Sequence, residues 1–216
     1  MPRVFEQPAT IALPDDALGE GAALEGLLIP APSLPDCAGG IVAAPHPLMG
    51  GSMDSPVVTE MAFALDKAGV ASLRFNWRGV GGSAGAPSGD DADADVDFAA
   101  SLAFLRDTVH GPVLAMGYSF GAATALRATR TAPGLRRLVL VAPPPSLVDA
   151  ALLESFDGPI LMVAGDADRF VDVDVLAQWA AERDGARLEV LEGADHFFMM
   201  HLGELRRALD GWLESS

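Results

Sequence analysis

Two patterns of hydrophobic and polar residues alternate along this chain. Short apolar runs bounded by Gly, Pro or polar residues are typical of buried parallel strands. Longer segments in which apolar residues recur every three or four positions are typical of helices that cover a sheet. We therefore expect strands from Gly39 (GGIVAAPH) and near residues 70–75, 113–117, 136–142, 159–164 and 187–191. The intervening helices are expected near residues 55–68, 93–109, 120–132, 172–184 and 203–214.

This alternation predicts an α/β fold built on a doubly wound, mostly parallel sheet with helices on both faces. Residues 9–13 and 22–29 predict two earlier strands joined by a polar turn, so we expect antiparallel pairing only at the N-terminal edge. No internal repeat, low-complexity linker or change of composition divides the 216 residues. We therefore expect a single domain over residues 1–216.

Charge and composition narrow the classes of function. The net charge is −16 and the chain has one lysine, Lys67, which argues against binding to nucleic acid or to an anionic membrane. No apolar run is long enough to cross a bilayer, and the start, MPRVFEQPAT, does not resemble a secretory signal. We therefore expect a cytoplasmic protein.

No metal site is predicted either. A single cysteine, Cys37, excludes a disulfide framework and a cysteine-based zinc site. The acidic run DDADADVD, residues 90–97, is better explained as the start of a helix, where carboxylates favour the positive end of the dipole, than as a metal site.

The segment GYSFG, residues 117–121, follows the apolar run PVLAM and precedes the helical run AATALRATRTA. It therefore predicts a strand that turns sharply into a helix with Ser119 at the corner, which is a nucleophile elbow. Gly117 and Gly121 are small enough to let strand and helix pack closely. The free N–H groups at the start of the helix would stabilise a negatively charged oxygen in front of Ser119.

A serine nucleophile requires a base and a carboxylate that orients the base. The segment GDADRFVD after the strand at 159–164 offers Asp166, Asp168 and Asp172, and ADHFF after the last strand offers His196. The ends of parallel strands meet at one edge of the sheet, and the order Ser, Asp, His is that of an elbow hydrolase. Spacing alone leaves open whether Asp166 or Asp168 is the acid.

A competing motif, GVGGSA at residues 79–84, nearly matches the dinucleotide-binding pattern GxGxxG/A. The following residues, GAPSG, delay the next helix, so its N-terminus cannot lie under a pyrophosphate. We therefore expect no nucleotide or other organic cofactor.

Five motifs in this order, APHPLMGG, LRFNWRGVGGS, GYSFG, GDADRFV and GADHFF, resemble those of compact, uncapped α/β-hydrolases of the dienelactone-hydrolase-like and small carboxylesterase type. The resemblance covers the chain from about residue 20 and implies the α/β-hydrolase fold. It also implies a triad of Ser119, His196 and Asp168, which lies three residues after Gly165 and three before Val171. Where many members have proline after that valine, this chain has aspartate.

The resemblance extends to the oxyanion hole. In HPLMGG the backbone, rather than the imidazole of His46, is implied to act. The N–H groups of Leu48 and Phe120 would then bind the oxyanion, with Met49 as the alternative first donor.

These features predict a serine hydrolase that cleaves small to medium acyl esters through an acyl-enzyme, without a metal or organic cofactor. Residues 143–158 leave no room for a cap domain, so we expect an open pocket. Its predicted lining residues are Met49, Trp77, Tyr118 and Phe197. Thioester, lactone or amide cleavage, or perhydrolysis, by the same triad remains an alternative. A second alternative is a non-catalytic interaction protein that keeps this fold. The exposed edge strand permits a homodimer as well as a monomer.

Overall fold

A computed structural model describes residues 5–34 and 38–215, so Cys37 lies outside the described part of the chain. In chain order the elements are β1 (Gln7–Ala12), α1 (Asp15–Leu18), β2 (Ala23–Ile29), β3 (Gly39–Ala43), α2 (Pro56–Lys67), β4 (Ala71–Phe75), α3 (Asp91–Thr108), β5 (Val113–Tyr118), α4 (Phe120–Ala128), β6 (Leu135–Val141), α5 (Ala150–Ser155), β7 (Ile160–Gly165), α6 (Val173–Ala181), β8 (Ala186–Leu191) and α7 (Leu202–Glu214). Short 3₁₀ helices lie at Pro47–Met49 and Pro145–Leu147.

Every predicted strand and long helix is present, whereas the sequence did not predict the one-turn helix α1 or the six-residue helix α5. Both are too short to show a clear helical period. Helix α4 ends at Ala128, before the predicted end at residue 132, and Thr129 to Ala132 continue as turns.

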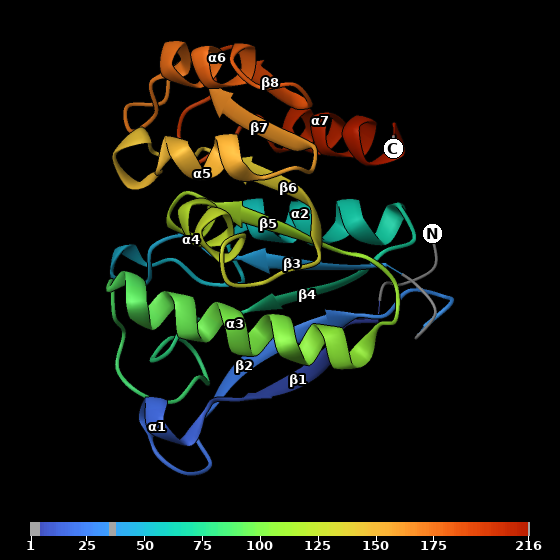
Figure 1. Cartoon of the computed structure of the whole chain (residues 1–216), viewed down its shortest axis with the longest axis vertical. Helices are drawn as coiled ribbons and strands as arrows, with labels where there is room; N and C mark the ends of the chain where they lie inside the picture. The colour runs from blue at the N-terminus through green and yellow to red at the C-terminus, as the bar shows by residue number, and fades with distance from the viewer. Residues whose placement is uncertain (1–4, 35–37, 216) are drawn as a thin grey trace.

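The strands form one sheet in the order β1-β2-β4-β3-β5-β6-β7-β8 (Figure 1). Strand β2 pairs antiparallel with β1 and with β4, and the other neighbouring pairs are parallel. The predicted α/β class with an antiparallel N-terminal edge is therefore confirmed. The carboxyl ends of the parallel strands all lie at one edge, which is on the left in Figure 1.

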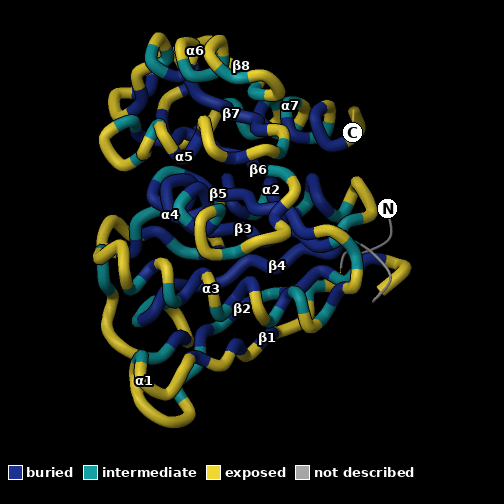
Figure 2. The backbone as a smooth tube through the Cα atoms, in the orientation of Figure 1, coloured by how far each residue is buried: buried dark blue, intermediate teal, exposed yellow. Residues whose placement is uncertain are grey.

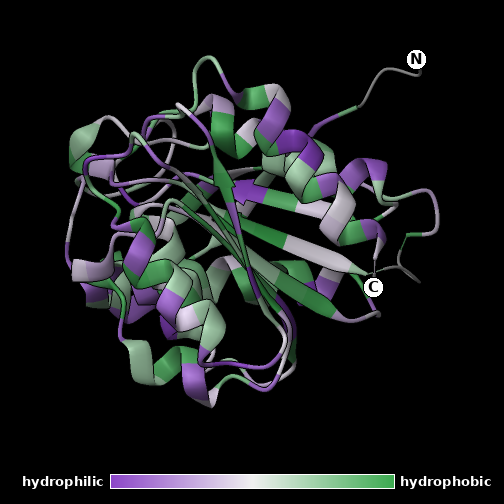
Figure 3. Ribbon diagram, turned by 90° about the horizontal axis from the view of Figure 1, so that it is seen from above, coloured by the Kyte–Doolittle hydropathy of each residue, from purple (hydrophilic) through white to green (hydrophobic). Residues whose placement is uncertain are grey.

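Helices cover both faces of the sheet. Helices α3 and α4 lie on the near side in Figure 1, and α2 lies on the far side, where it packs against α7. Every residue of β3, β4, β5 and β7 is buried, and apart from Ser72 and Arg74 of β4 these residues are apolar (Figures 2 and 3). A sheet buried on both faces explains why β3, β5 and β7 are continuous hydrophobic runs rather than alternating ones. No helix within the described residues is long and apolar enough to span a membrane.

A buried ion pair anchors the loop after β4 to helix α3. The Arg78 guanidinium donates to both carboxylate oxygens of Asp97, with Nη2 at 2.8 Å and Nε at 3.0 Å from Oδ1. The Arg78 N–H adds a bond of 2.8 Å to Asp97 Oδ2, and Arg78 also contacts Asp93. Burial raises the pKa of Asp97, although its bonds with Arg78 act in the opposite direction. Part of the acidic run at 90–97 therefore fixes the loop that follows β4.

Replacing Asp97 by alanine should leave the Arg78 guanidinium buried with only its contacts to Asp93. We expect Asp97→Ala to lower the free energy of unfolding by about 3 kcal/mol, as in other broken buried ion pairs. The matched control is Asp91→Ala on the same helix, because Asp91 is 64% exposed and pairs with Arg127 at the surface. The control should lose less than about 1 kcal/mol. Urea denaturation of both variants measures the difference, and equal losses would contradict a special role for the Arg78–Asp97 pair.

Candidate active site

The turn at Ser119 has the strained backbone that the sequence predicts. Ser119 has φ 56° and ψ −115°, a conformation that residues other than glycine rarely adopt. The turn is held because the Ser119 N–H donates to the Val141 carbonyl of the neighbouring strand at 2.9 Å. Phe120 is the first residue of α4, so its N–H has no acceptor within the helix and remains available beside Ser119.

Gly117 and Gly121 have to be glycine, because the neighbouring backbone leaves no room for a side chain at either position. A Cβ atom on Gly117 would lie 2.1 Å from the Gly121 carbonyl oxygen. A Cβ atom on Gly121 would lie 2.4 Å from the Ala43 carbonyl oxygen of strand β3. Helix α4 thus begins in direct backbone contact with the strands below it.

His196 lies between Ser119 and Asp168. Its Nε2 is 3.0 Å from Ser119 Oγ, and its Nδ1 is 2.7 Å from Asp168 Oδ2. The Asp168 side chain is fully buried, and that of His196 is 10% exposed. A carboxylate can only accept, so Nδ1 carries the proton and Nε2 is left to accept the Ser119 hydroxyl. The three residues therefore form a chain in which the imidazole can take a proton from the serine.

The other acidic residues of the segment after β7 lie elsewhere. Asp166 Oδ1 accepts the Gly193 N–H at 2.6 Å, which ties this loop to the one after β8. Asp172 caps helix α6 by accepting the N–H groups of Asp174 and Val175. Of the three candidates, the structure thus brings only Asp168 to the imidazole.

Tyr118 has a positioning role that the sequence did not indicate. Its hydroxyl donates to the His196 carbonyl at 2.8 Å and so links the residue before the nucleophile to the histidine loop. Burial is the main cause that raises the pKa of Tyr118, and the nearby charges of Asp168 and Asp195 add to it. The phenol therefore stays protonated and remains a donor.

Asp195 shapes the turn that carries His196. Its carboxylate accepts the N–H groups of Phe197 and Phe198, each at 3.1 Å. Phe198 has φ 54° and a fully buried side chain, so its ring anchors the turn in the core. The contacts of Asp195 and Phe198 therefore fix the backbone before and after His196 in the sequence.

The predicted oxyanion donors on the loop after β3 are engaged in this structure. The Leu48 N–H donates to His46 Nδ1 at 3.2 Å, and the Met49 N–H donates to the His46 carbonyl at 3.0 Å. His46 in turn packs against Phe120, with their ring centroids 4.8 Å apart. Neither Leu48 nor Met49 therefore presents a free amide beside Ser119, in contrast to Phe120.

A cavity of about 460 Å³ opens in front of Ser119 and His196. Met49, Tyr118 and Phe197 line it, as the sequence predicts. Trp77 does not: it is 1% exposed, and its Nε1 donates to the carbonyls of Ala44 and Pro45, so it supports the loop after β3 from below. The assignment of Trp77 to the pocket is thus wrong, because this residue, two positions after the end of β4, turns into the core.

Phe170 also lines this cavity, which the sequence did not predict. Phe170 lies two residues after Asp168 in the same GDADRF segment, is 60% exposed and lines the cavity next to the imidazole. Its position after a candidate catalytic aspartate at a strand end is the signal that would have identified it.

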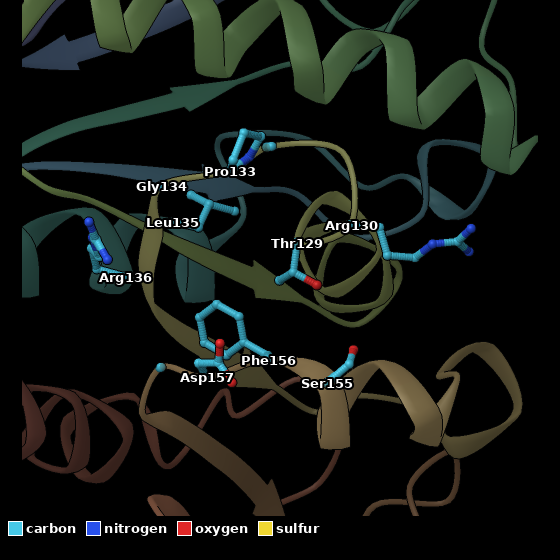
Figure 4. Close-up of a pocket in the computed structure, with 11 residues that line it drawn as sticks. Thr129, Arg130, Pro133, Gly134, Leu135, Arg136, Ser155, Phe156 and Asp157 are labelled. Carbon is cyan, nitrogen blue, oxygen red and sulfur yellow. The ribbon is translucent and has the colours of Figure 1, made fainter.

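A larger hollow of about 520 Å³ lies at the opposite edge of the sheet, before β6 and β7 (Figure 4). Its hydroxyl groups are bonded to backbone: Thr129 donates to the Leu126 carbonyl and Ser155 to the Leu152 carbonyl. The Arg130 side chain extends away from Phe156. Among the described residues that line this hollow, no nucleophile is paired with a base. Among the described residues, no group of three or more His, Cys, Asp or Glu side chains is placed to hold a metal ion.

Comparison with known proteins agrees with this fold. A family model for the alpha/beta hydrolase fold matches residues 46–155, which is half of the chain. The chain belongs to the α/β-hydrolase family. The hydrolase is 30% identical to an alpha-beta serine hydrolase homologue from Coxiella burnetii, with a TM-score of 0.82 over 96% of this chain and 97% of that one.

Two further relatives are similar over most of their length. XC6422 from Xanthomonas campestris, a serine hydrolase without a lid, is 30% identical, with a TM-score of 0.81 over 99% of the hydrolase and 95% of that chain. The uncharacterised protein RP471 of Rickettsia prowazekii is 29% identical over 206 residues, which cover 90% of the hydrolase and 86% of RP471. The uncapped α/β-hydrolase architecture expected from the motifs is thus confirmed.

Because β5 and α4 are in close contact, a side chain at Gly117 should destabilise the fold. A methyl group at this position must displace backbone, so we expect Gly117→Ala to lower the free energy of unfolding by about 3 kcal/mol. The matched control is Gly211→Ala within α7, where the added carbon meets no atom within 4 Å apart from the backbone of its own helix and its chain neighbours. The control should gain about 0.5 to 1 kcal/mol, because alanine favours a helix more than glycine does. Urea denaturation compares the two, and a stable Gly117→Ala protein would contradict the tight contact.

Proposed function

We propose that this hydrolase cleaves carboxylic esters through an acyl-enzyme on Ser119, with His196 as general base and acid and Asp168 as the group that orients it. The observation that carries the proposal is the chain of contacts from Ser119 Oγ through His196 to Asp168, at 3.0 and 2.7 Å. Serine is a weak nucleophile unless a positioned base removes its proton, and this arrangement supplies that base.

In the first half of the reaction, Ser119 Oγ attacks the ester carbonyl carbon while its proton passes to His196 Nε2. The carbonyl oxygen becomes negatively charged in the tetrahedral intermediate. The bond from carbon to the leaving oxygen then breaks, and the imidazolium gives its proton to that oxygen. The products of this half are the free alcohol and an ester of Ser119.

In the second half, a water molecule occupies the place of the alcohol. Its proton passes to Nε2 as its oxygen attacks the acyl carbon, and the same proton returns to Ser119 Oγ when the carboxylic acid leaves. The Asp168 carboxylate remains ionised throughout and stabilises the imidazolium in both halves. No atom changes its oxidation state, so the chemistry requires no redox partner.

The negative oxygen of the intermediate is bound by backbone N–H groups. The Phe120 N–H at the start of α4 is one donor, assisted by the positive end of the helix dipole. We assign the second to Leu48, whose N–H exchanges the neutral acceptor His46 Nδ1 for the charged oxygen. A bond to an oxyanion is stronger than one to an uncharged imidazole, which favours this exchange.

The size and polarity of the cavity support small to medium acyl esters as substrates. A volume of about 460 Å³ suits a small organic molecule. Among the described residues that line it, none is Asp, Glu, Lys or Arg, which favours a neutral substrate. The same triad chemistry would apply to thioesters, lactones or amides, and matched substrates of each class distinguish these from esters.

Labelling with a fluorophosphonate tests the nucleophile without assuming a substrate. We expect stoichiometric modification at Ser119, mapped by mass spectrometry, because only an activated serine reacts. Labelling should be lost in Ser119→Ala and in His196→Ala, and kept in Ser155→Ala, since Ser155 lies at the opposite edge of the sheet. A folded protein that takes no label would leave the fold without the proposed activity.

A second experiment separates the two candidate acids. Asp168→Asn should lower kcat by about 10³- to 10⁴-fold, because an amide no longer fixes the imidazole tautomer that accepts the serine proton. Asp166→Asn is the matched control, since its amide oxygen can still accept the Gly193 N–H, and its activity should change little. Equal losses in the two variants, in a steady-state ester assay, would contradict the assignment of Asp168.

A further inference from the structure

We propose that the side of this site that receives the leaving alcohol is built for an apolar ring, so that the enzyme prefers neutral esters of aromatic or alicyclic alcohols. The inference rests on the proposed ester hydrolysis and specifies its substrate. It is carried by two exposed phenylalanine rings, Phe170 and Phe197, which flank the catalytic imidazole from different loops.

The proton path decides on which side of Ser119 the alcohol lies. His196 Nε2 is the atom that faces Ser119 Oγ, and it must also reach the leaving oxygen. The alcohol part of an ester therefore lies over the imidazole. The carbonyl oxygen points instead toward the Phe120 N–H and the loop after β3, so the two parts of the substrate meet different side chains.

Both phenylalanine rings contact the imidazole. The centroid of the Phe170 ring is 4.9 Å from that of His196, and the Phe197 centroid is 5.7 Å away at an interplanar angle of 86°. Both residues line the cavity and remain 60% and 59% exposed. An apolar group over the imidazole would cover ring surface that is otherwise left in water, and aromatic rings add edge and stacking contacts.

The backbone that carries each ring is fixed before a substrate arrives. The Phe170 N–H donates to Asp168 Oδ1 at 2.8 Å, so the carboxylate that orients His196 also fixes the start of the Phe170 turn. The Phe197 N–H donates to Asp195 Oδ1 at 3.1 Å. Because the backbone is already fixed, only the two side chains have to be ordered when a substrate binds, which makes the pair suited to recognition.

Charge argues against the main alternative, an anionic leaving group such as a phosphorylated alcohol or thiol. Among the described lining residues there is no lysine or arginine to pair with it. The net charge of −16 adds a general repulsion of anions. The leaving group that fits both the rings and the charge is therefore neutral and apolar.

Two isomeric esters test the inference. Benzyl acetate carries its ring on the alcohol side, and methyl phenylacetate carries it on the acyl side, with the same atoms and similar unactivated leaving groups. We expect kcat/KM, which reports acylation, to be about tenfold higher for benzyl acetate. Equal values, or a preference for methyl phenylacetate, would overturn the inference and leave the esterase function standing.

Variants of the two rings show whether they cause the preference. Phe170→Ala and Phe197→Ala should each lower the ratio of kcat/KM for benzyl acetate to that for ethyl acetate by about three- to tenfold. Phe170→Tyr should retain the ratio because it keeps the ring. The matched control is Phe5→Ala, which removes a phenylalanine that is 74% exposed and lies outside the cavity. Loss of both activities in equal measure would indicate a structural role and contradict the inference.

The labelling and hydrolysis experiments together distinguish a wrong ring preference from a wrong esterase assignment. An enzyme that a fluorophosphonate labels at Ser119 but that hydrolyses neither isomer remains a serine hydrolase, and the alcohol-side ring preference is then wrong. A protein that neither reacts with the probe nor hydrolyses any ester loses the proposed function itself.

Discussion

The structure depends on the contact between the end of strand β5 and the start of helix α4. There is no space for a side-chain carbon at Gly117 or Gly121, so the helix begins directly on the backbone of β3 and β5. Ser119 is consequently held at φ 56°, above the sheet edge and beside the N-terminus of α4. The loops after β7 and β8 need only reach this one point, because parallel strands end at the same edge.

Among the described residues, strained backbone conformations lie at that edge of the sheet. The residues other than glycine with positive φ are Ser119, Ala142 and Phe198, and they follow β5, β6 and β8. Each is held by its surroundings: the Ser119 N–H bonds to β6, the Ala142 N–H bonds to β7, and the Phe198 ring is fully buried. Unfavourable backbone conformations persist only where neighbouring structure determines them, and here the sheet and core do so.

The acidic composition has local uses beyond solubility. Asp90, Asp149 and Asp172 cap helices α3, α5 and α6 through their side chains. Asp168 and Asp195 accept N–H groups two residues further along and so shape the turns around the imidazole. Because each of these bonds is formed by a carboxylate with nearby backbone, the aspartates shape the turns and helix starts that present the site.

The sequence by itself determined the α/β class, the order of strands and long helices, the elbow at Ser119 and the two segments that supply acid and base. These follow from local periodicity and from the rule that parallel strands end at one edge. The motif resemblance already selected Asp168 over Asp166. Only the tertiary structure showed that Trp77 is buried and that the Tyr118 hydroxyl bonds to the His196 carbonyl. Only the structure showed that the Leu48 N–H donates to His46. Such choices depend on side-chain directions between loops that are distant along the chain, and residue spacing carries no information about them.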